Sequence, residues 1–208
     1  MKDTSVIILC AGHQERWGDI SCKHLVPIDK EPLLFRTVKQ CKKIFGVEPV
    51  VATQNPLLDK LSRHKGYESH IPFMCRWTVE TLSSTLDQII YYPGGNPLPI
   101  MIVLLGDVYY TDVTLRVIKK GNTLVYGDSY EIYGLKLCNH NRARVALKKA
   151  IAHAEEGGTG KLWEFYRAYI DIPMMPHVEW LDVEFTFIDD ETQDFDTYEE
   201  YKQFIANR

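Results

Sequence analysis

The residues best suited to phosphate chemistry lie in one loop near the start of the chain. Gly12, Arg16 and Lys23 follow an apolar run, Val6 to Leu9, that is too short for a buried helix and rich in β-branched residues. Such a run predicts a strand covered on both faces, as in the middle of a parallel sheet. A strand that opens into a loop with a glycine and two cations is typical of phosphate binding. The alternative is an ordinary connection with solvent-facing charges, but most connections have only about 4–6 residues, so we favour phosphate.

A second candidate group is the aspartate that follows the other strongly apolar run. Ile100 to Leu105 predicts a second central strand, and Asp107 comes shortly after it. Ligands of open α/β sheets bind at the carboxyl ends of the strands, so Asp107 is expected at the same rim as the loop from Gly12 to Lys23. Taken alone, Gly-Asp is typical of a turn or helix cap. Beside that loop we interpret Asp107 as a ligand for Mg²⁺, which usually takes one or two carboxylates plus substrate phosphates.

Alternating strands and helices must position these groups. The remaining strands are expected at 49–52, 71–75, 123–126, 131–138 and within 178–188. Helices are expected at 33–45, from 55, from the hydroxylated turn at 83–85, and at 113–120, 144–156, 163–169 and 197–206. This alternation predicts an α/β sheet, mostly parallel and flanked by helices, in a single domain spanning 1–208.

The opening segment resembles a family of nucleotidyltransferases, which activate sugar phosphates, choline phosphate, methylerythritol phosphate and molybdopterin. The family pattern runs Leu-Ala-Ala-Gly-x-Gly-x-Arg, then Pro-Lys-x-Leu, then a Gly-Lys-Pro-Leu-like turn; here it stands as LCAGHQER, CKHL and DKEPLL. Gln14 replaces the second glycine, and Cys22 replaces the proline. The resemblance implies a Rossmann-like fold of the GT-A type and Mg²⁺ as cofactor. It also implies an enzyme that joins a nucleoside triphosphate to a phosphorylated small molecule and releases pyrophosphate.

The same resemblance assigns roles within the loop and in a turn near residue 84. Lys23 would contact the α-phosphate, and Arg16, whose planar fork suits phosphate oxygens, would contact the β- and γ-phosphates. These two are the expected catalytic pair. The expected nucleotide contacts are Leu9, Ala11, Gly12, Ser83, Ser84 and Thr85. The last three are also what a helix start prefers, so capping is a second interpretation of that turn.

Two further segments complete the implied site. DFDTYEEY, residues 194–201, resembles a family segment whose leading acidic residue binds the metal, so Asp194 is expected to join Asp107. Asp196 we interpret either as a helix cap, because Glu199 stands three residues later, or as a residue that supports the metal ligands from behind. Lys161 and Trp163 are expected at the acceptor, since the choline phosphate branch carries a Tyr-Trp-Glu-like stretch at a comparable place and an aromatic face can hold a quaternary ammonium. An amphipathic helix with buried aromatic residues is the alternative. The glycine-rich stretch at 157–161 fails the P-loop spacing.

Composition excludes other function classes. The 208 residues carry a formal net charge of −4, which gives no global attraction for nucleic acid or an anionic membrane. No apolar run approaches the ~20 residues of a membrane span, and the five cysteines lack a Cys-x-x-Cys pair, which favours reduced thiols in a cytoplasmic protein. The expected partners are a nucleoside triphosphate and a phosphorylated acceptor; a homodimer is left open.

Two other functions fit the same scaffold less well. A glycosyltransferase of the related nucleotide-sugar-binding fold usually carries Asp-x-Asp after the mid-chain strand, whereas here Tyr109 stands at the second position. A non-catalytic nucleotide-binding protein is supported only by Gln14. We therefore predict a Mg²⁺-dependent nucleotidyltransferase whose base and acceptor the sequence does not specify.

Overall fold

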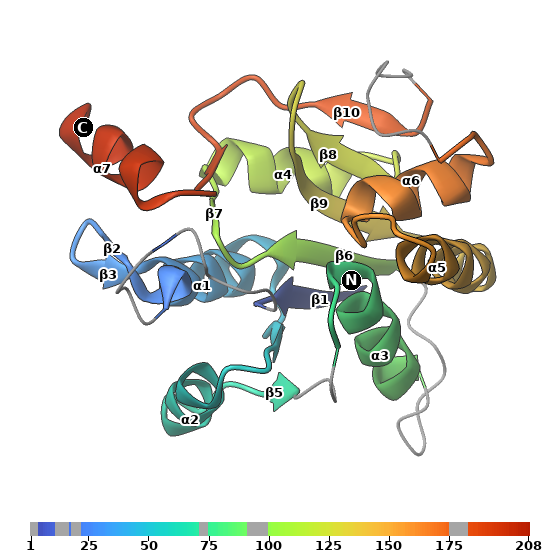
Figure 1. Cartoon of the computed structure of the whole chain (residues 1–208). Coiled ribbons are helices and arrows are strands. Elements are labelled where there is room, and N and C mark those ends of the chain that lie inside the picture. Colours follow the sequence, from blue (N-terminus) through green and yellow to red (C-terminus); the bar gives the residue numbers. More distant parts are fainter. Residues whose placement is uncertain (1–3, 11–16, 18–21, 71–74, 91–99, 175–182) are drawn as a thin grey trace.

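One mixed sheet forms the centre of the molecule. The computed structural model describes residues 4–10, 17, 22–70, 75–90, 100–174 and 183–208. In these segments seven strands follow the order β10-β8-β9-β6-β1-β4-β5 (Figure 1). They are β1 (Thr4–Leu9), β4 (Val50–Ala52), β5 (Ser69–His70), β6 (Ile100–Leu105), β8 (Val125–Gly127), β9 (Ile132–Leu137) and β10 (Phe185–Phe187). All neighbours pair in parallel except β9, which is antiparallel to both β6 and β8. The expected α/β sheet, mostly parallel, is confirmed.

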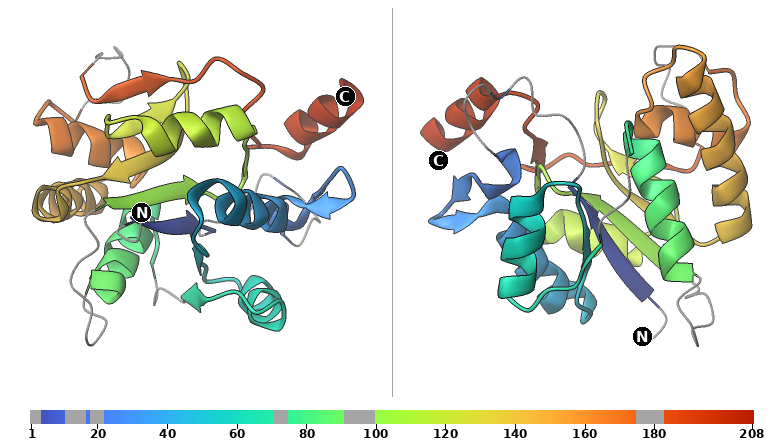
Figure 2. Two further views of the ribbon diagram at one scale, coloured as in Figure 1. Left: turned by 180° about the vertical axis from the view of Figure 1, so that it is seen from behind. Right: turned by 60° about the horizontal axis from the view of Figure 1, so that its bottom comes forward.

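Helices cover both faces of this sheet. They are α1 (Leu33–Phe45), α2 (Pro56–His64), α3 (Thr78–Ile90), α4 (Asp112–Lys120), α5 (His140–Glu155), α6 (Leu162–Ile170) and α7 (Tyr198–Ala206). Along β1, Val6 and Ile8 pack with α1, α2 and α4, whereas Ile7 and Leu9 pack with α3, α5 and α6. Side chains alternate between the faces of a strand, so a continuous apolar run is what two helical layers require. Figure 2 shows the two layers on opposite sides of the sheet.

Two small ribbons and α7 lie beyond the carboxyl ends of the central strands. β2 (Pro27–Ile28) pairs with β3 (Glu31–Pro32), and β7 (Val108–Tyr109) pairs with β11 (Gln193–Asp194). A third apolar cluster fills the space between them; its buried members are Trp17, Val26, Ile28, Leu33, Tyr109, Phe195 and Tyr201. The Trp17 indole Nε1 donates to the carbonyl oxygens of Phe195 and Asp196, at 3.2 and 3.1 Å. This contact joins the first loop to the end of the chain.

The expected start of α3 is wrong. The helix begins at Thr78, five residues before Ser83, and Glu80 accepts hydrogen bonds from the backbone N–H groups of Arg76 and Trp77. The hydroxyl groups that suggested a cap lie inside the helix instead: Thr85 donates to the carbonyl of Thr81. Hydroxyl side chains inside helices often bond to the carbonyl four residues back, and the sequence pattern does not distinguish this from a cap.

Other boundaries differ by smaller amounts. The expected capping box at Asp196 and Glu199 is wrong by one residue, because Thr197 caps α7 and forms the capping box with Glu200. Asn139 caps α5, which therefore begins four residues earlier than expected. The predicted strand at 71–75 lies almost wholly outside the described residues. All five cysteines lie in described segments, and none of them forms a disulfide there. Among the described residues, no helix has the length and apolar character needed to cross a membrane.

Candidate active site

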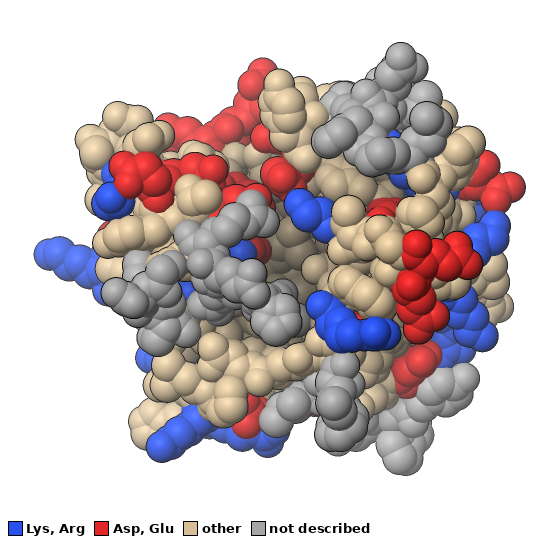
Figure 3. Space-filling model, in the orientation of Figure 1, with Lys and Arg blue, Asp and Glu red and all other residues tan. Residues whose placement is uncertain are grey.

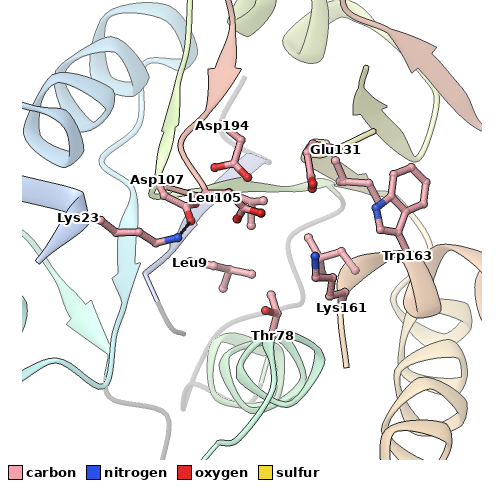
Figure 4. A pocket seen from close by; sticks show the side chains of 12 residues that line it. Leu9, Lys23, Thr78, Leu105, Asp107, Glu131, Lys161, Trp163 and Asp194 are labelled. Carbon is pink, nitrogen blue, oxygen red and sulfur yellow. Dashed lines mark ion pairs between the residues drawn. The ribbon is translucent and has the colours of Figure 1, made fainter. Parts of the chain in front are cut away.

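A cavity of about 170 Å³ opens at the carboxyl ends of β1 and β6. Figure 3 shows a hollow near the middle of this face with acidic and basic side chains around it, and Figure 4 shows the cavity from close by. Its described lining residues are Leu9, Lys23, Thr78, Leu105, Asp107, Glu131, Ile132, Lys161, Leu162, Trp163, Asp194 and Asp196. Six of the predicted site residues therefore share one space: Leu9, Lys23, Asp107, Lys161, Trp163 and Asp194.

The first end of the cavity, which we call the ion-pair end, consists of Lys23, Asp107 and Asp194. Lys23 begins a single 3₁₀ turn, Lys23–Leu25, and its ammonium forms an ion pair with Oδ2 of Asp107 (Figure 4). The two side chains are only 13% and 18% exposed. Burial works against ionisation of Asp107, but the Lys23 ammonium holds the pKa of that carboxyl below its usual value. Both groups are therefore charged near neutral pH.

Gly106 allows the ends of β1 and β6 to lie close together. Its N–H donates to the carbonyl oxygen of Leu9 at 2.8 Å. A Cβ atom at this position would lie 2.3 Å from the sulfur of Cys10 and 3.0 Å from the Leu9 carbonyl oxygen and from the His24 ring. A side chain at this position would therefore force its neighbours to shift. The Gly-Asp pair thus combines a close contact between β1 and β6 with a carboxylate at the cavity.

Asp194 reaches the same place from the far end of the sequence. In the ribbon of β7 and β11, Asp194 pairs with Val108, the residue after Asp107. Burial raises the pKa of Asp194 well above its ordinary value, and the neighbouring Asp107 carboxylate raises it further. Its Oδ1 atom is buried and accepts no hydrogen bond from the described residues. A buried oxygen without a donor beside a second carboxylate is the arrangement that a cation would stabilise.

The carboxylate pair fits the expected Mg²⁺. Among the described residues, no three His, Cys, Asp or Glu side chains are placed to hold a metal ion together. Mg²⁺ does not require three, because it keeps several waters and is commonly held by one or two carboxylates with substrate phosphates. Asp107 and Asp194 supply hard oxygen ligands of that kind, and Asp196 also lines the cavity.

The other end of the cavity, which we call the aromatic end, consists of Glu131, Lys161 and Trp163. Lys161 is the residue before α6, and Trp163 is stacked on Phe185 with ring centroids 6.2 Å apart. Glu131 immediately precedes β9. Because β9 runs antiparallel to β6, its first residues lie at the edge where β1 and β6 end. Sequence reasoning missed Glu131, since the strand direction that places it there is decided by the fold.

The glycine-rich stretch before α6 has a structural role. The N–H groups of Thr159 and Gly160 donate to the carboxylate of Glu164 at 2.6 and 2.9 Å. These amides bind a carboxylate of the protein itself. This agrees with the sequence analysis, in which the stretch fails the P-loop spacing. Gly160 packs against Trp77, and its carbonyl accepts from the N–H of Val79 at 3.2 Å. These contacts hold the starts of α3 and α6 together and bring Thr78 to the cavity.

The remaining predicted contacts fall into two groups. Ala11, Gly12 and Arg16 lie outside the described residues. Ser83 and Ser84 line a separate surface hollow beside Asp87, and Thr85 is fully buried. Thr78, five to seven residues earlier on the same helix, faces the cavity instead (Figure 4).

Comparison with known proteins supports the same fold. No protein-family model matches the sequence, and no curated protein matches it significantly. A solved nucleotidyl transferase from Methanothermobacter thermautotrophicus is similar over 100% of both chains, with 14% identity and a TM-score of 0.68. A nucleoside-diphosphate-sugar pyrophosphorylase from Vibrio cholerae has 13% identity and a TM-score of 0.65, covering 96% of this chain and 99% of its own. CTP:phosphocholine cytidylyltransferase from Streptococcus pneumoniae has 15% identity and a TM-score of 0.62 over 99% of both chains. The chain has the fold that these nucleotidyltransferases share, as its opening segment implied.

Proposed function

We propose that this protein is a Mg²⁺-dependent nucleotidyltransferase that joins a nucleoside triphosphate to a phosphorylated small molecule. The observation that carries this proposal is the shared cavity of Lys23, Asp107, Asp194 and Lys161 on a nucleotidyltransferase fold. In the reaction, an oxygen of the acceptor phosphate forms a bond to the α-phosphorus. The bond from that phosphorus to the bridging oxygen breaks, and pyrophosphate leaves.

The charges of the ion-pair end suit this chemistry. Both reactants are anions, and negative charge develops on the leaving pyrophosphate, so cations must neutralise the reacting groups. The phosphate nucleophile is already ionised near neutral pH, so no general base is needed. Lys23 is proposed to contact the α-phosphate, with Arg16 on the β- and γ-phosphates. Asp107 and Asp194 are proposed to hold Mg²⁺, which would supply further neutralisation of the phosphates.

The aromatic end suits the acceptor. Lys161 supplies a cation for the acceptor phosphate, Trp163 supplies a flat apolar wall, and Glu131 supplies a carboxylate for a hydroxyl or ammonium group. Sugar phosphates and phospho-alcohols such as choline phosphate both offer such groups. The acceptor is therefore proposed to lie between Lys161 and Glu131, with its phosphate directed toward Lys23.

Pyrophosphate release tests this function. The purified protein with Mg²⁺ is assayed with the four ribonucleoside triphosphates and dTTP against a panel of sugar phosphates and phospho-alcohols. We expect release with one pair of substrates, loss of release on adding excess EDTA, and recovery with added Mg²⁺. Nucleotide binding without pyrophosphate release across the panel would contradict the enzymatic function and favour a nucleotide-binding protein. Transfer from a nucleotide sugar would favour the glycosyltransferase.

A further inference from the structure

We propose that Lys23 occupies the place of the metal ion when no nucleotide is bound, so that metal and nucleotide bind together rather than independently. The inference rests on the proposed function only in assuming that Asp107 and Asp194 bind a divalent cation. It concerns whether the metal and the nucleotide bind separately or together, which the overall reaction does not specify.

Lys23 and Asp107 are in direct contact. The Lys23 ammonium forms an ion pair with Oδ2 of Asp107, where both side chains are more than four-fifths buried. Asp194 lies beside this pair across the ribbon of β7 and β11, and it interacts electrostatically with both partners. Among the described residues of the ion-pair end, the Lys23 ammonium thus supplies the positive charge beside the carboxyl groups of Asp107 and Asp194. It neutralises the same group that would ligate the metal.

A metal ion and the Lys23 ammonium would repel each other at Asp107. A divalent ion on Asp107 while Lys23 remains there would place two cations against one carboxylate, at a depth where water screens charges poorly. Lys23 must therefore move away from Asp107 as the metal binds. A triphosphate supplies the anion that an ammonium released from Asp107 requires. Metal binding without nucleotide should be weak, and each ligand should tighten the binding of the other by the same factor.

Mn²⁺ binding to the full-length protein without nucleotide tests this role. Free Mn²⁺ is measured by electron paramagnetic resonance for the wild type and for Lys23→Met, which keeps most of the length of the side chain and removes its charge. We expect Lys23→Met to bind Mn²⁺ about three- to tenfold more tightly than the wild type, because its competitor is absent. Asp194→Asn should weaken Mn²⁺ binding both in the wild type and in Lys23→Met. Circular dichroism and thermal unfolding check that each variant is folded, and Lys23→Gln replaces Lys23→Met if it is not.

Lys161→Met is the matched control. It removes one positive charge from the same cavity but from the opposite end, so it measures the effect of net charge alone. We expect its Mn²⁺ affinity to remain within about twofold of the wild type, since its ammonium is not paired with Asp107.

The outcomes separate this inference from the proposed function. If Lys23→Met binds Mn²⁺ no more tightly than the wild type, or if Lys161→Met tightens binding equally, the role of Lys23 is wrong, while pyrophosphate release would still support the nucleotidyltransferase. If Lys23→Met alone tightens binding but the pyrophosphate assay is silent, the role of Lys23 is supported and the proposed reaction fails. Absence of Mn²⁺ binding in every variant would overturn the inference.

Discussion

The two ends of the cavity are built in different ways. At the ion-pair end, Lys23 and Asp107 are mostly buried; Asp107 comes shortly after the central strand β6, and Lys23 reaches it from the 3₁₀ turn that follows the loop after β1. At the aromatic end, Lys161 is exposed and precedes a helix, while Trp163 is half-buried on that helix. The ion-pair end is thus supported by the sheet, whereas the aromatic end depends on how α3, α6 and the start of β9 come together.

This difference matches the two tasks in the proposed reaction. Phosphate chemistry requires charged groups held in fixed positions, and groups at the ends of packed strands are held more firmly than groups on loops. Recognition of an acceptor requires side chains that suit one small molecule, and residues at helix starts and loops can change without disturbing the sheet. The ion-pair end should therefore control the rate, and the aromatic end should control acceptor affinity.

Asp107→Asn should have the largest effect. It removes the charge that holds Lys23 and would ligate the metal but keeps the shape of the side chain, so we expect pyrophosphate release to fall at least about 100-fold. Thermal unfolding should show a folded protein that melts at a lower temperature, because the buried Lys23 ammonium loses its partner. Glu191→Asn, at an exposed position away from the described cavity lining, is the control. Near-normal turnover in Asp107→Asn would remove Asp107 from the catalytic machinery.

Gly106→Ala tests how firmly the sheet supports the ion-pair end. The added Cβ would lie 2.3 Å from the Cys10 sulfur, and we expect a loss of about 1–3 kcal/mol in the free energy of unfolding, measured by urea titration. Because the sulfur is the nearest atom, Cys10→Ala in the same chain should recover part of this loss. A double-mutant cycle without coupling would show that the close contact does not determine the cost.

Lys161→Ala should affect the acceptor rather than the chemistry. Loss of a charged hydrogen bond to the acceptor phosphate should raise the acceptor KM about tenfold, and the nucleotide KM should change by less than about twofold. Lys161→Arg keeps the charge and should recover most of the affinity. An equal increase of both KM values would argue against a division of the cavity into two ends.

Glu131→Gln should have the smallest effect, on the pH dependence of stability. Burial raises the pKa of Glu131, and nearby carboxylates, Asp196 foremost, raise it further, although the Lys161 ammonium lowers it. The folded protein therefore holds this proton more tightly than the unfolded chain, so the wild type loses stability as pH rises from the unfolded-state pKa through the folded-state pKa. The glutamine variant avoids this loss.

Urea unfolding of both proteins over that pH range measures the difference. We expect Glu131→Gln to be more stable than the wild type at neutral pH by roughly 0.5 kcal/mol, with the gain disappearing in acid below the unfolded-state pKa. Glu156→Gln, at an exposed helix end, is the control. A gain that is independent of pH would mean that the ionisation of Glu131 is not its cause.

Much of the ion-pair end could be predicted because its signals are local. The apolar runs of β1 and β6 predict the central strands. The loop after each strand carries a charged residue of the site, Lys23 after β1 and Asp107 after β6. Parallel neighbours end at the same edge, so Asp107 could be expected near the loop that carries Lys23. The helix beginning at Thr78 was misplaced because hydroxyl residues serve both as caps and as interior residues bonded to the preceding turn.

The sequence by itself determined the class of fold, the two central strands and the charged residues that end them. Only the tertiary structure decided that Glu131 and Thr78 reach the cavity, that Gly106 must approach Cys10, and that Lys23 lies on Asp107. The physical reason is the range of the interactions. Periodicity and motif spacing express contacts between residues close in the chain, whereas the direction of β9 and the docking of α3 against α6 arise from packing between segments far apart.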